Sequence, residues 1–298
     1  MMIEKLDLIG NSGRIFRDDI YPFLGGGNKG RKIKYIEKDI ILKKCNAVVT
    51  TGGIQSNHCR ALAILAAKNN WGCTLVIHGN KELFYKEAGN ALMMRLSGAE
   101  IIFVSADKIQ ETMDQVMLDY FSSGSSPYYV WGGGHTLEGG KAYIDAIEDV
   151  YDYSIENNWE PDYIFLASGT GSTQAGIISG LDKMNFDTQV IGISIARNRK
   201  RAEEVVSLFC NKLEVAFNIK SLKKDIIVLD DYLCGGYEKY DSNIDKVTEN
   251  ALSNYGFLLD HTYSGKAFYG MLDFIKVNNI TNNNILFWHT GGVFNYLS

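Results

Sequence analysis

Short apolar segments rich in valine and isoleucine alternate along the chain with longer segments in which apolar residues recur at helical spacing. The short segments show no strict alternation with polar residues, as expected for strands that are covered on both faces. Their order is typical of a parallel sheet between layers of helices. The predicted strands are 46–51, 73–78, 100–105, 127–131, 162–168, 189–196, 225–231 and 284–290. The predicted helices are 56–70, 84–97, 107–122, 138–157, 173–185, 200–215 and 243–255.

This pattern predicts an α/β protein whose ligands bind beyond the carboxyl ends of the strands. Glycine-rich loops follow several of those strands, so the chemistry is expected on the loops. We find no internal repeat or low-complexity tract, and the 3 prolines leave no room for a proline-rich linker. Any domain boundary must therefore be placed from motifs rather than from composition.

Composition narrows the function classes. The 298 residues are 46% hydrophobic and 22% charged, which is ordinary for a globular protein. The net charge of -5 comes from interspersed charges without a basic run, so we expect no nucleic-acid partner. The apolar run 61–67 is too short to cross a membrane, and the N-terminus lacks a signal-peptide core, so we expect a cytoplasmic protein. The 5 cysteines have no metal-site spacing, and we expect no metal.

The stretch GGGNKGRKIKYI at 25–36 places a lysine directly after glycines and an asparagine. Lys29 continues an apolar stripe through Ile33 and Ile36, so it is expected to face the interior. An amine that burial has deprived of its proton is nucleophilic enough to form a Schiff base. Lys32 lies near the edge of the same stripe and remains a rival. The alternative for either is an ordinary first-turn lysine whose amine reaches water.

Two further stretches follow predicted strands and open helices. LASGTGSTQAGI at 166–177 aims backbone N–H groups and hydroxyls at one point, which favours a bound phosphate, although it lacks the Walker spacing. TTGGIQSNHCRA at 50–61 presents four consecutive polar side chains, which favours a carboxylate site. In both stretches helix capping is the alternative explanation. No GxSxG motif accompanies the second stretch, so its serine and histidine are no evidence for a hydrolase triad.

Together with LLDHTYSGKAFYG at 258–270 and ILFWHTGG at 285–292, these blocks resemble, in order and over nearly the whole chain, the fold-type II pyridoxal-phosphate enzymes. The group they resemble contains the aminocyclopropane-carboxylate deaminases and the D-cysteine desulfhydrases. The resemblance implies a tryptophan synthase β-like fold of two open-sheet α/β domains. The smaller one would be 35–140, and the larger, cofactor-binding one 1–34 plus 141–298. It also implies pyridoxal 5'-phosphate, a small amino-acid substrate and a homodimer.

The resemblance assigns roles to individual residues. Lys29 looks like the Schiff-base lysine and then the base for the substrate's α-proton, and Asn57 looks like the partner of the cofactor's phenolic oxygen. Ser56 would meet the substrate, with His58 beside it. Tyr263 would assist the base or protonate the leaving group, or else be a plain packing aromatic, and Tyr237 would line the pocket. The implied phosphate cup is Gly169, Thr170, Gly171, Ser172 and Thr173.

Two positions separate the branches of the family. Ser264 stands where the deaminases have glutamate, and Thr290 stands where they have leucine. A carboxylate would keep the pyridine nitrogen protonated, whereas a hydroxyl leaves it largely neutral, which favours loss of a β leaving group. The sequence QSNH also resembles the desulfhydrase form. We therefore expect α,β-elimination, with D-cysteine giving pyruvate, sulfide and ammonia.

Alternatives remain on the same scaffold, namely an aminocyclopropane-carboxylate deaminase, a β-replacement enzyme or a sulfo-lyase. A catalytically inactive binder of a phosphate ligand is the alternative outside the enzymes. The sequence also departs from the family pattern. His135 and Thr136 replace the usual Ser-Asn pair, and Cys234 lies in LCGGYE, where the relatives have a proline-rich loop. His135 would either contact the substrate or serve as an ordinary loop residue.

Overall fold

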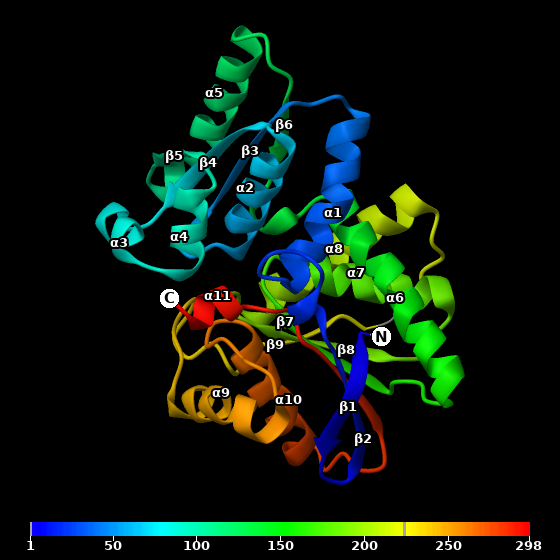
Figure 1. Cartoon of the computed structure of the whole chain (residues 1–298). Helices are drawn as coiled ribbons and strands as arrows, with labels where there is room; N and C mark the ends of the chain where they lie inside the picture. The colour runs from blue at the N-terminus through cyan, green and yellow to red at the C-terminus, as the bar shows by residue number, and fades with distance from the viewer. Residues whose placement is uncertain (1, 223–224) are drawn as a thin grey trace.

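The computed structural model describes residues 2–222 and 225–298, whose strands form two separate sheets (Figure 1). The larger sheet has the order β1-β2-β10-β7-β8-β9 and the smaller one the order β5-β4-β3-β6. The strands are β1 Ile3–Leu8, β2 Asn11–Phe16, β3 Ala47–Gly53, β4 Gly72–His78, β5 Glu100–Phe103, β6 Pro127–Val130, β7 Tyr163–Ser168, β8 Gln189–Ser194, β9 Ile227–Leu229 and β10 Asn284–Trp288. The helices are α1 Gly27–Leu42, α2 Asn57–Asn69, α3 Lys81–Lys86, α4 Gly89–Leu96, α5 Ile109–Ser122, α6 Leu137–Asn157, α7 Ser172–Met184, α8 Arg199–Phe217, α9 Ser242–Tyr255, α10 Ser264–Val277 and α11 Val293–Tyr296.

Every predicted strand has a counterpart, and all of them pair in parallel, as predicted. The antiparallel hairpin of β1 and β2 was not predicted; in β1, Leu6 and Leu8 pack into the core on one face and Ile3 into the core on the other. The predicted helix 84–97 is wrong as one element, because the chain breaks between α3 and α4. The break precedes Gly89, whose positive φ of 60° is incompatible with a continuous helix.

Helices cover both faces of each sheet, which confirms the two open-sheet α/β architecture. In the larger sheet, α6, α7 and α8 lie over one face, and α9 and α10 over the other (Figure 1). In the smaller sheet, α1, α2 and α4 pack on one face and α5 packs on the other. All strands of the smaller sheet fall within 35–140, while the domain boundaries themselves stay a prediction.

None of the described helices is long and apolar enough to cross a membrane. Among the same residues, no cluster of three histidine, cysteine or acidic side chains is arranged to hold a metal ion.

A buried carboxylate after β2 links this part of the larger sheet to β10 and to helices α1 and α6. Asp18, directly after β2, is fully buried and accepts hydrogen bonds from Arg31 of α1 and Trp288 of β10. The donor–acceptor distances are 2.7 Å to Arg31 Nε and 3.0 Å to Trp288 Nε1, and the Tyr143 hydroxyl of α6 donates as well. The Asp18 carboxylate therefore fixes α1 against the sheet through its charge partner, Arg31.

We predict that Asp18→Asn lowers the free energy of unfolding by about 3 kcal/mol, because it leaves the buried Arg31 guanidinium without its close carboxylate. Urea unfolding measures this. The matched control is Glu111→Gln, which breaks an exposed ion pair with Lys108 and should change stability by less than about 1 kcal/mol. Equal stability of the two variants would contradict a structural role for Asp18.

Candidate active site

The site is a cavity of about 570 Å³ between the two sheets, formed by loops at the carboxyl ends of their strands. A cavity of this volume suits a small ligand. It brings together most residues singled out from the sequence. Those that line it are Lys29, Ser56, Asn57, His58, Gly169, Thr170, Gly171, Thr173, Tyr237, Tyr263 and Thr290.

The glycines before Lys29 are required by close backbone approaches. Gly26 and Gly27 have φ of +47° and +74°, a region that other residues rarely adopt. A Cβ on Gly26 would lie 2.0 Å from the carbonyl oxygen of Asp19, and one on Gly27 would lie 2.9 Å from that of Thr290. Because these positions bear no side chain, α1 can begin against the turn after β10, with Lys29 in its first turn.

The two candidate lysines occupy different environments. Lys29 lines the cavity, and its Nζ donates to the carbonyl oxygen of Gly133 at 3.2 Å. Burial, with the nearby charge of Arg60, lowers the pKa of Lys29 to about 8. Lys32 lies outside the lining, and its Nζ donates to Ser172 Oγ at 2.7 Å. Burial and the charge of Lys29 hold the pKa of Lys32 well below its usual value.

The loop 169–173 leads into the first turn of α7, a geometry that could hold an anion. Gly171, with φ of +84°, lets the chain turn into the helix, whose first N–H groups have no partner within the helix. Thr170 and Thr173 line the cavity, and Thr173 Oγ1 accepts from Asn28 Nδ2 at 3.2 Å. The Ser172 side chain does not line it, because its hydroxyl turns to Lys32. The Ser172 hydroxyl accepts from Lys32 and keeps its own proton, so the phosphate contact expected of it stays a prediction.

Histidine and serine at the beginning of α2 have defined hydrogen-bonding roles. Ser56 caps the helix by accepting from the backbone N–H of Cys59 at 3.2 Å, so capping does occur, but its hydroxyl proton stays available to the cavity. The Thr50 hydroxyl donates to Val130 O, and therefore His58 must donate its Nε2–H to Thr50 Oγ1, 2.8 Å away. Burial and nearby lysines lower the pKa of His58 to about 3. His58 is thus neutral, with Nδ1 as a bare acceptor.

Two phenols close one side of the cavity. The hydroxyl oxygens of Tyr237 and Tyr263 lie 2.5 Å apart, and both rings line the cavity. Burial raises the pKa of both groups, that of Tyr263 well above its usual value. At neutral pH both remain protonated, so the pair can donate a hydrogen bond and neither group is a phenolate base.

Ser264 and Thr290 differ in whether they line the cavity. The Ser264 hydroxyl donates to Asp260 Oδ1 at 2.7 Å and accepts from the Asp260 N–H at 2.8 Å, and Ser264 does not line the cavity. Thr290 does line it. A direct contact of the Ser264 hydroxyl with a ligand is therefore not supported, because Asp260 at the start of α10 occupies it.

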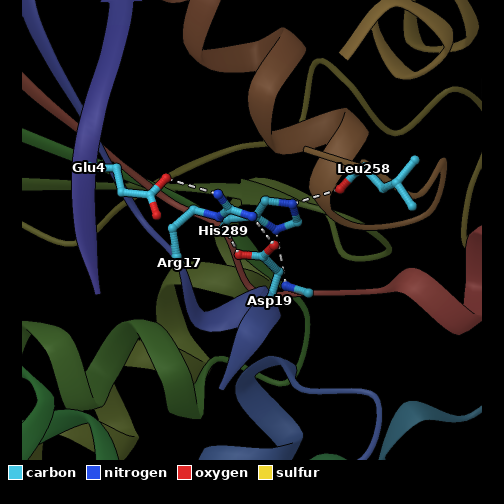
Figure 2. Close-up of polar contacts among 6 residues, drawn as sticks. Glu4, Arg17, Asp19, Leu258 and His289 are labelled. Carbon is cyan, nitrogen blue, oxygen red and sulfur yellow. Dashed lines mark hydrogen bonds and ion pairs between the residues drawn. The ribbon is translucent and has the colours of Figure 1, made fainter. Parts of the chain in front are cut away.

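The turn that carries Thr290 is anchored by its neighbour, His289. Gly291 N–H donates to His289 Nδ1 at 3.2 Å, so Nε2 must bear the proton that reaches Leu258 O at 2.7 Å. Figure 2 shows His289 beside the ion pair of Arg17 with Asp19. Burial lowers the pKa of His289, which keeps the ring neutral and preserves both hydrogen bonds.

His135 lies away from the cavity lining. Its ring packs against Phe209, with 4.1 Å between ring centroids, and burial lowers its pKa to about 4. The substrate contact expected of His135 is therefore not supported, and the packing role is what the structure shows.

Several lining residues were missed in the sequence. Arg197 lies three residues beyond β8, lines the cavity and donates from Nη1 to the carbonyl oxygen of Gly169. Its place after a parallel strand was the available signal. The other missed lining residues include Asn28, Thr51, His78, Gln110 and Trp131. Gln110 comes from a helix rather than from a strand end, so strand-end reasoning does not reach it.

Comparisons with known proteins show what this chain is similar to. A family model described as "Pyridoxal-phosphate dependent enzyme" matches residues 16–291. The chain is 30% identical to the 1-aminocyclopropane-1-carboxylate deaminase of Rhizobium rhizogenes, over 97% of this chain and 91% of that protein. It is also 30% identical to the D-cysteine desulfhydrase of Yersinia enterocolitica, over 97% and 90%. A crystal structure of an ACC deaminase homologue superposes with a TM-score of 0.88 at 28% identity, covering 97% of this chain and 87% of that one, and confirms the predicted fold type.

We predict that Lys29 reacts with a small aldehyde in a pH range below that of surface lysines, because only the unprotonated amine attacks. Its labelling should rise through about pH 8 and then level off. Lys108 is the internal control, since its hydrogen bond to Glu111 raises its pKa and its labelling should still increase above that range. Reductive methylation over a pH series, read by peptide mass spectrometry, measures both. Identical midpoints would contradict the lowered pKa of Lys29.

Proposed function

Because the chain belongs to the family of pyridoxal-phosphate dependent enzymes, we propose that it catalyses α,β-elimination from a small amino acid, with D-cysteine as the leading substrate. The reaction breaks the Cα–H and Cβ–S bonds and releases sulfide. Water then converts the released enamine to pyruvate and ammonia. The homodimer and the cytoplasmic location stay predictions.

The donor set of the cavity fits this cofactor. The beginning of α7, with Thr170 and Thr173, suits a phosphate dianion, and Lys32 behind Ser172 supplies a nearby amine. Lys29 is the lysine of the lining, and its lowered pKa suits an amine that combines with an aldehyde. When bound, pyridoxal phosphate provides the electron sink that delocalises negative charge from the substrate's α-carbon.

Other steps of the reaction fall to the residues of this chain, which accept the α-proton, hold the substrate carboxylate and assist the leaving group. Lys29 Nζ, once free, accepts the α-proton, for which a pKa of about 8 is suitable near neutral pH. The hydroxyl of Ser56 and the free N–H groups at the beginning of α2 hold the substrate carboxylate. The Tyr237–Tyr263 pair donates a hydrogen bond to the departing thiolate, because both phenols stay protonated.

The observation that carries elimination is the character of the side chains at the positions that separate the two branches. Thr290, whose side chain carries a neutral hydroxyl, lines the cavity, and the Ser264 hydroxyl is occupied by Asp260. The Asp260 carboxylate is itself outside the lining, held by three backbone N–H groups and by Ser264. A ring nitrogen that meets a hydroxyl rather than a carboxylate stays largely neutral, which supports rapid loss of a leaving group.

Curated relatives carry both deaminase and desulfhydrase names at the same identity, so the substrate must be tested directly. We predict pyruvate and sulfide in equal amounts from D-cysteine, and little 2-oxobutyrate from 1-aminocyclopropane-1-carboxylate. Coupled product assays over D-cysteine, L-cysteine, D-serine and β-chloroalanine measure the preference. Efficient opening of the cyclopropane ring with negligible sulfide release would overturn the proposal in favour of the deaminase.

The assignment of Lys29 has its own test. We predict that Lys29→Ala abolishes the yellow colour of the purified protein and nearly all turnover. Lys32→Met, which keeps the buried volume, should remain yellow and bind the cofactor more weakly, by about tenfold, because a group near the phosphate is lost. Absorption spectra before and after borohydride reduction decide. A colourless Lys32→Met protein beside a yellow Lys29→Ala protein would reverse the assignment.

A further inference from the structure

A buried cation without a carboxylate partner lies beside the cavity. Arg60 of α2 is 1% exposed, and the described residues place no acidic group at ion-pair distance from it. Its Nε donates to Asn90 Oδ1 at 3.0 Å, and its Nη1 donates to the carbonyl oxygen of Leu24. Its guanidinium also lies over the ring of Phe294, 5.4 Å from the centroid. Burial of an arginine among neutral oxygens is unfavourable, so this position calls for a functional explanation.

Arg60 is the fixed end of a chain of side-chain amides. A guanidinium can only donate, so the atom of Asn90 that faces Arg60 must be its carbonyl oxygen. The Asn90 NH₂ therefore points the other way, toward Asn57 Oδ1 at 3.0 Å and Asn295 Oδ1 at 3.1 Å. The backbone carbonyl of Gln55, 3.2 Å from Asn90 Nδ2, can only accept and requires the same orientation.

The orientation passes on to Asn57. Since Asn57 Oδ1 accepts from Asn90, its NH₂ is the end left for other partners, and one N–H goes to Asn295 Oδ1. Asn295 in turn donates its own NH₂ to Gln55 O at 3.2 Å, which fixes its oxygen toward Asn57. Asn57 also lines the cavity, so its second N–H is available there.

We propose that Arg60 and Asn90 are positioning residues that fix the Asn57 carboxamide as a hydrogen-bond donor to the phenolic oxygen of the cofactor. This inference rests on the proposed contact between Asn57 and that oxygen. A free carboxamide presents its oxygen or its NH₂ with similar ease, and an oxygen facing a phenolate would repel it. The obligatory donor Arg60 removes that ambiguity through Asn90.

The chain of amides also joins distant parts of the sequence. Asn57 and Asn90 belong to the elements of the smaller sheet, whereas Asn295 belongs to α11, which follows the last strand of the larger sheet. Figure 1 shows α11 between the two halves of the molecule, next to α4. Phe294 of the same helix covers Arg60. The C-terminal helix thus contacts the network at both ends, at Arg60 through Phe294 and at Asn57 through Asn295.

The test compares two substitutions that add the same charge to the same network. Asn90→Asp can accept from Arg60 but cannot donate to Asn57, so the Asn57 carboxamide should turn its NH₂ toward the introduced carboxylate and its oxygen toward the cofactor. Asn295→Asp loses its donation to Gln55 O, but a carboxylate oxygen still accepts from Asn57 Nδ2, so Asn57 keeps its orientation. We expect the dissociation constant of pyridoxal phosphate to rise about tenfold or more in Asn90→Asp and the absorption maximum of the bound cofactor to shift. Asn295→Asp should stay within about threefold of wild type.

Asn57→Leu separates failure of the inference from failure of its premise. If this variant binds the cofactor with wild-type affinity and spectrum, the contact of Asn57 is absent and the inference falls with it. If Asn57→Leu weakens binding while Asn90→Asp and Asn295→Asp behave alike, the contact stands and the positioning role is overturned. Thermal unfolding checks that each variant is folded. Should Asn90→Asp fail to fold, Arg60→Met must weaken cofactor binding and Arg60→Lys, which keeps an obligatory donor, must restore it.

Discussion

The ion pair between Asp18 and Arg31 is the constraint from which the geometry of the site follows. It joins the end of β2 to α1, and the same carboxylate holds Trp288, two residues before Thr290. Helix α1 carries Lys29 only two residues before Arg31. The position of the Lys29 amine relative to the turn after β10 therefore depends on this buried charge pair. Removing either partner leaves the other charge buried and uncompensated, which is strongly destabilising.

Burial of cationic groups is the second organising principle. Lys29, Lys32 and Arg60 gather around the cavity, and Arg197 lies at its rim, whereas Asp107 is the carboxylate among its described lining residues. Such an excess of positive charge is unfavourable in the empty protein and favourable once a phosphate and an amino-acid carboxylate are present. The low pKa of Lys29 is part of the same arrangement, since desolvation and the charge of Arg60 both disfavour its protonated form.

The parallel strands and part of the cavity lining could be predicted because they depend on local pattern. Apolar runs followed by helical segments define both sheets, strand ends place Ser56 and Thr170 near a common edge, and the helical stripe turns Lys29 inward. What escaped prediction depends on partners far away in the sequence. Ser264 was expected in the site, but its hydroxyl goes to Asp260, and His135 was expected at the rim, but Phe209 attracts its ring. The β1–β2 hairpin was missed because its short alternating strands differ from the apolar runs elsewhere.

The direction of the hydrogen bonds decides which groups of the site act as donors and which as acceptors, and the residue types alone do not decide this. A carboxamide or an imidazole can present either a donor or an acceptor, and an active site works only if one of them is fixed. In this protein the choice is made by groups that can play only one role. The Gly291 N–H fixes the orientation of His289, and the Arg60 guanidinium fixes that of Asn90. The Thr50 hydroxyl donates to Val130 O and thereby fixes which nitrogen of His58 carries the proton. Each of these groups lies outside the reacting centre. The donors and acceptors that a ligand meets are therefore fixed by residues behind those that would touch it.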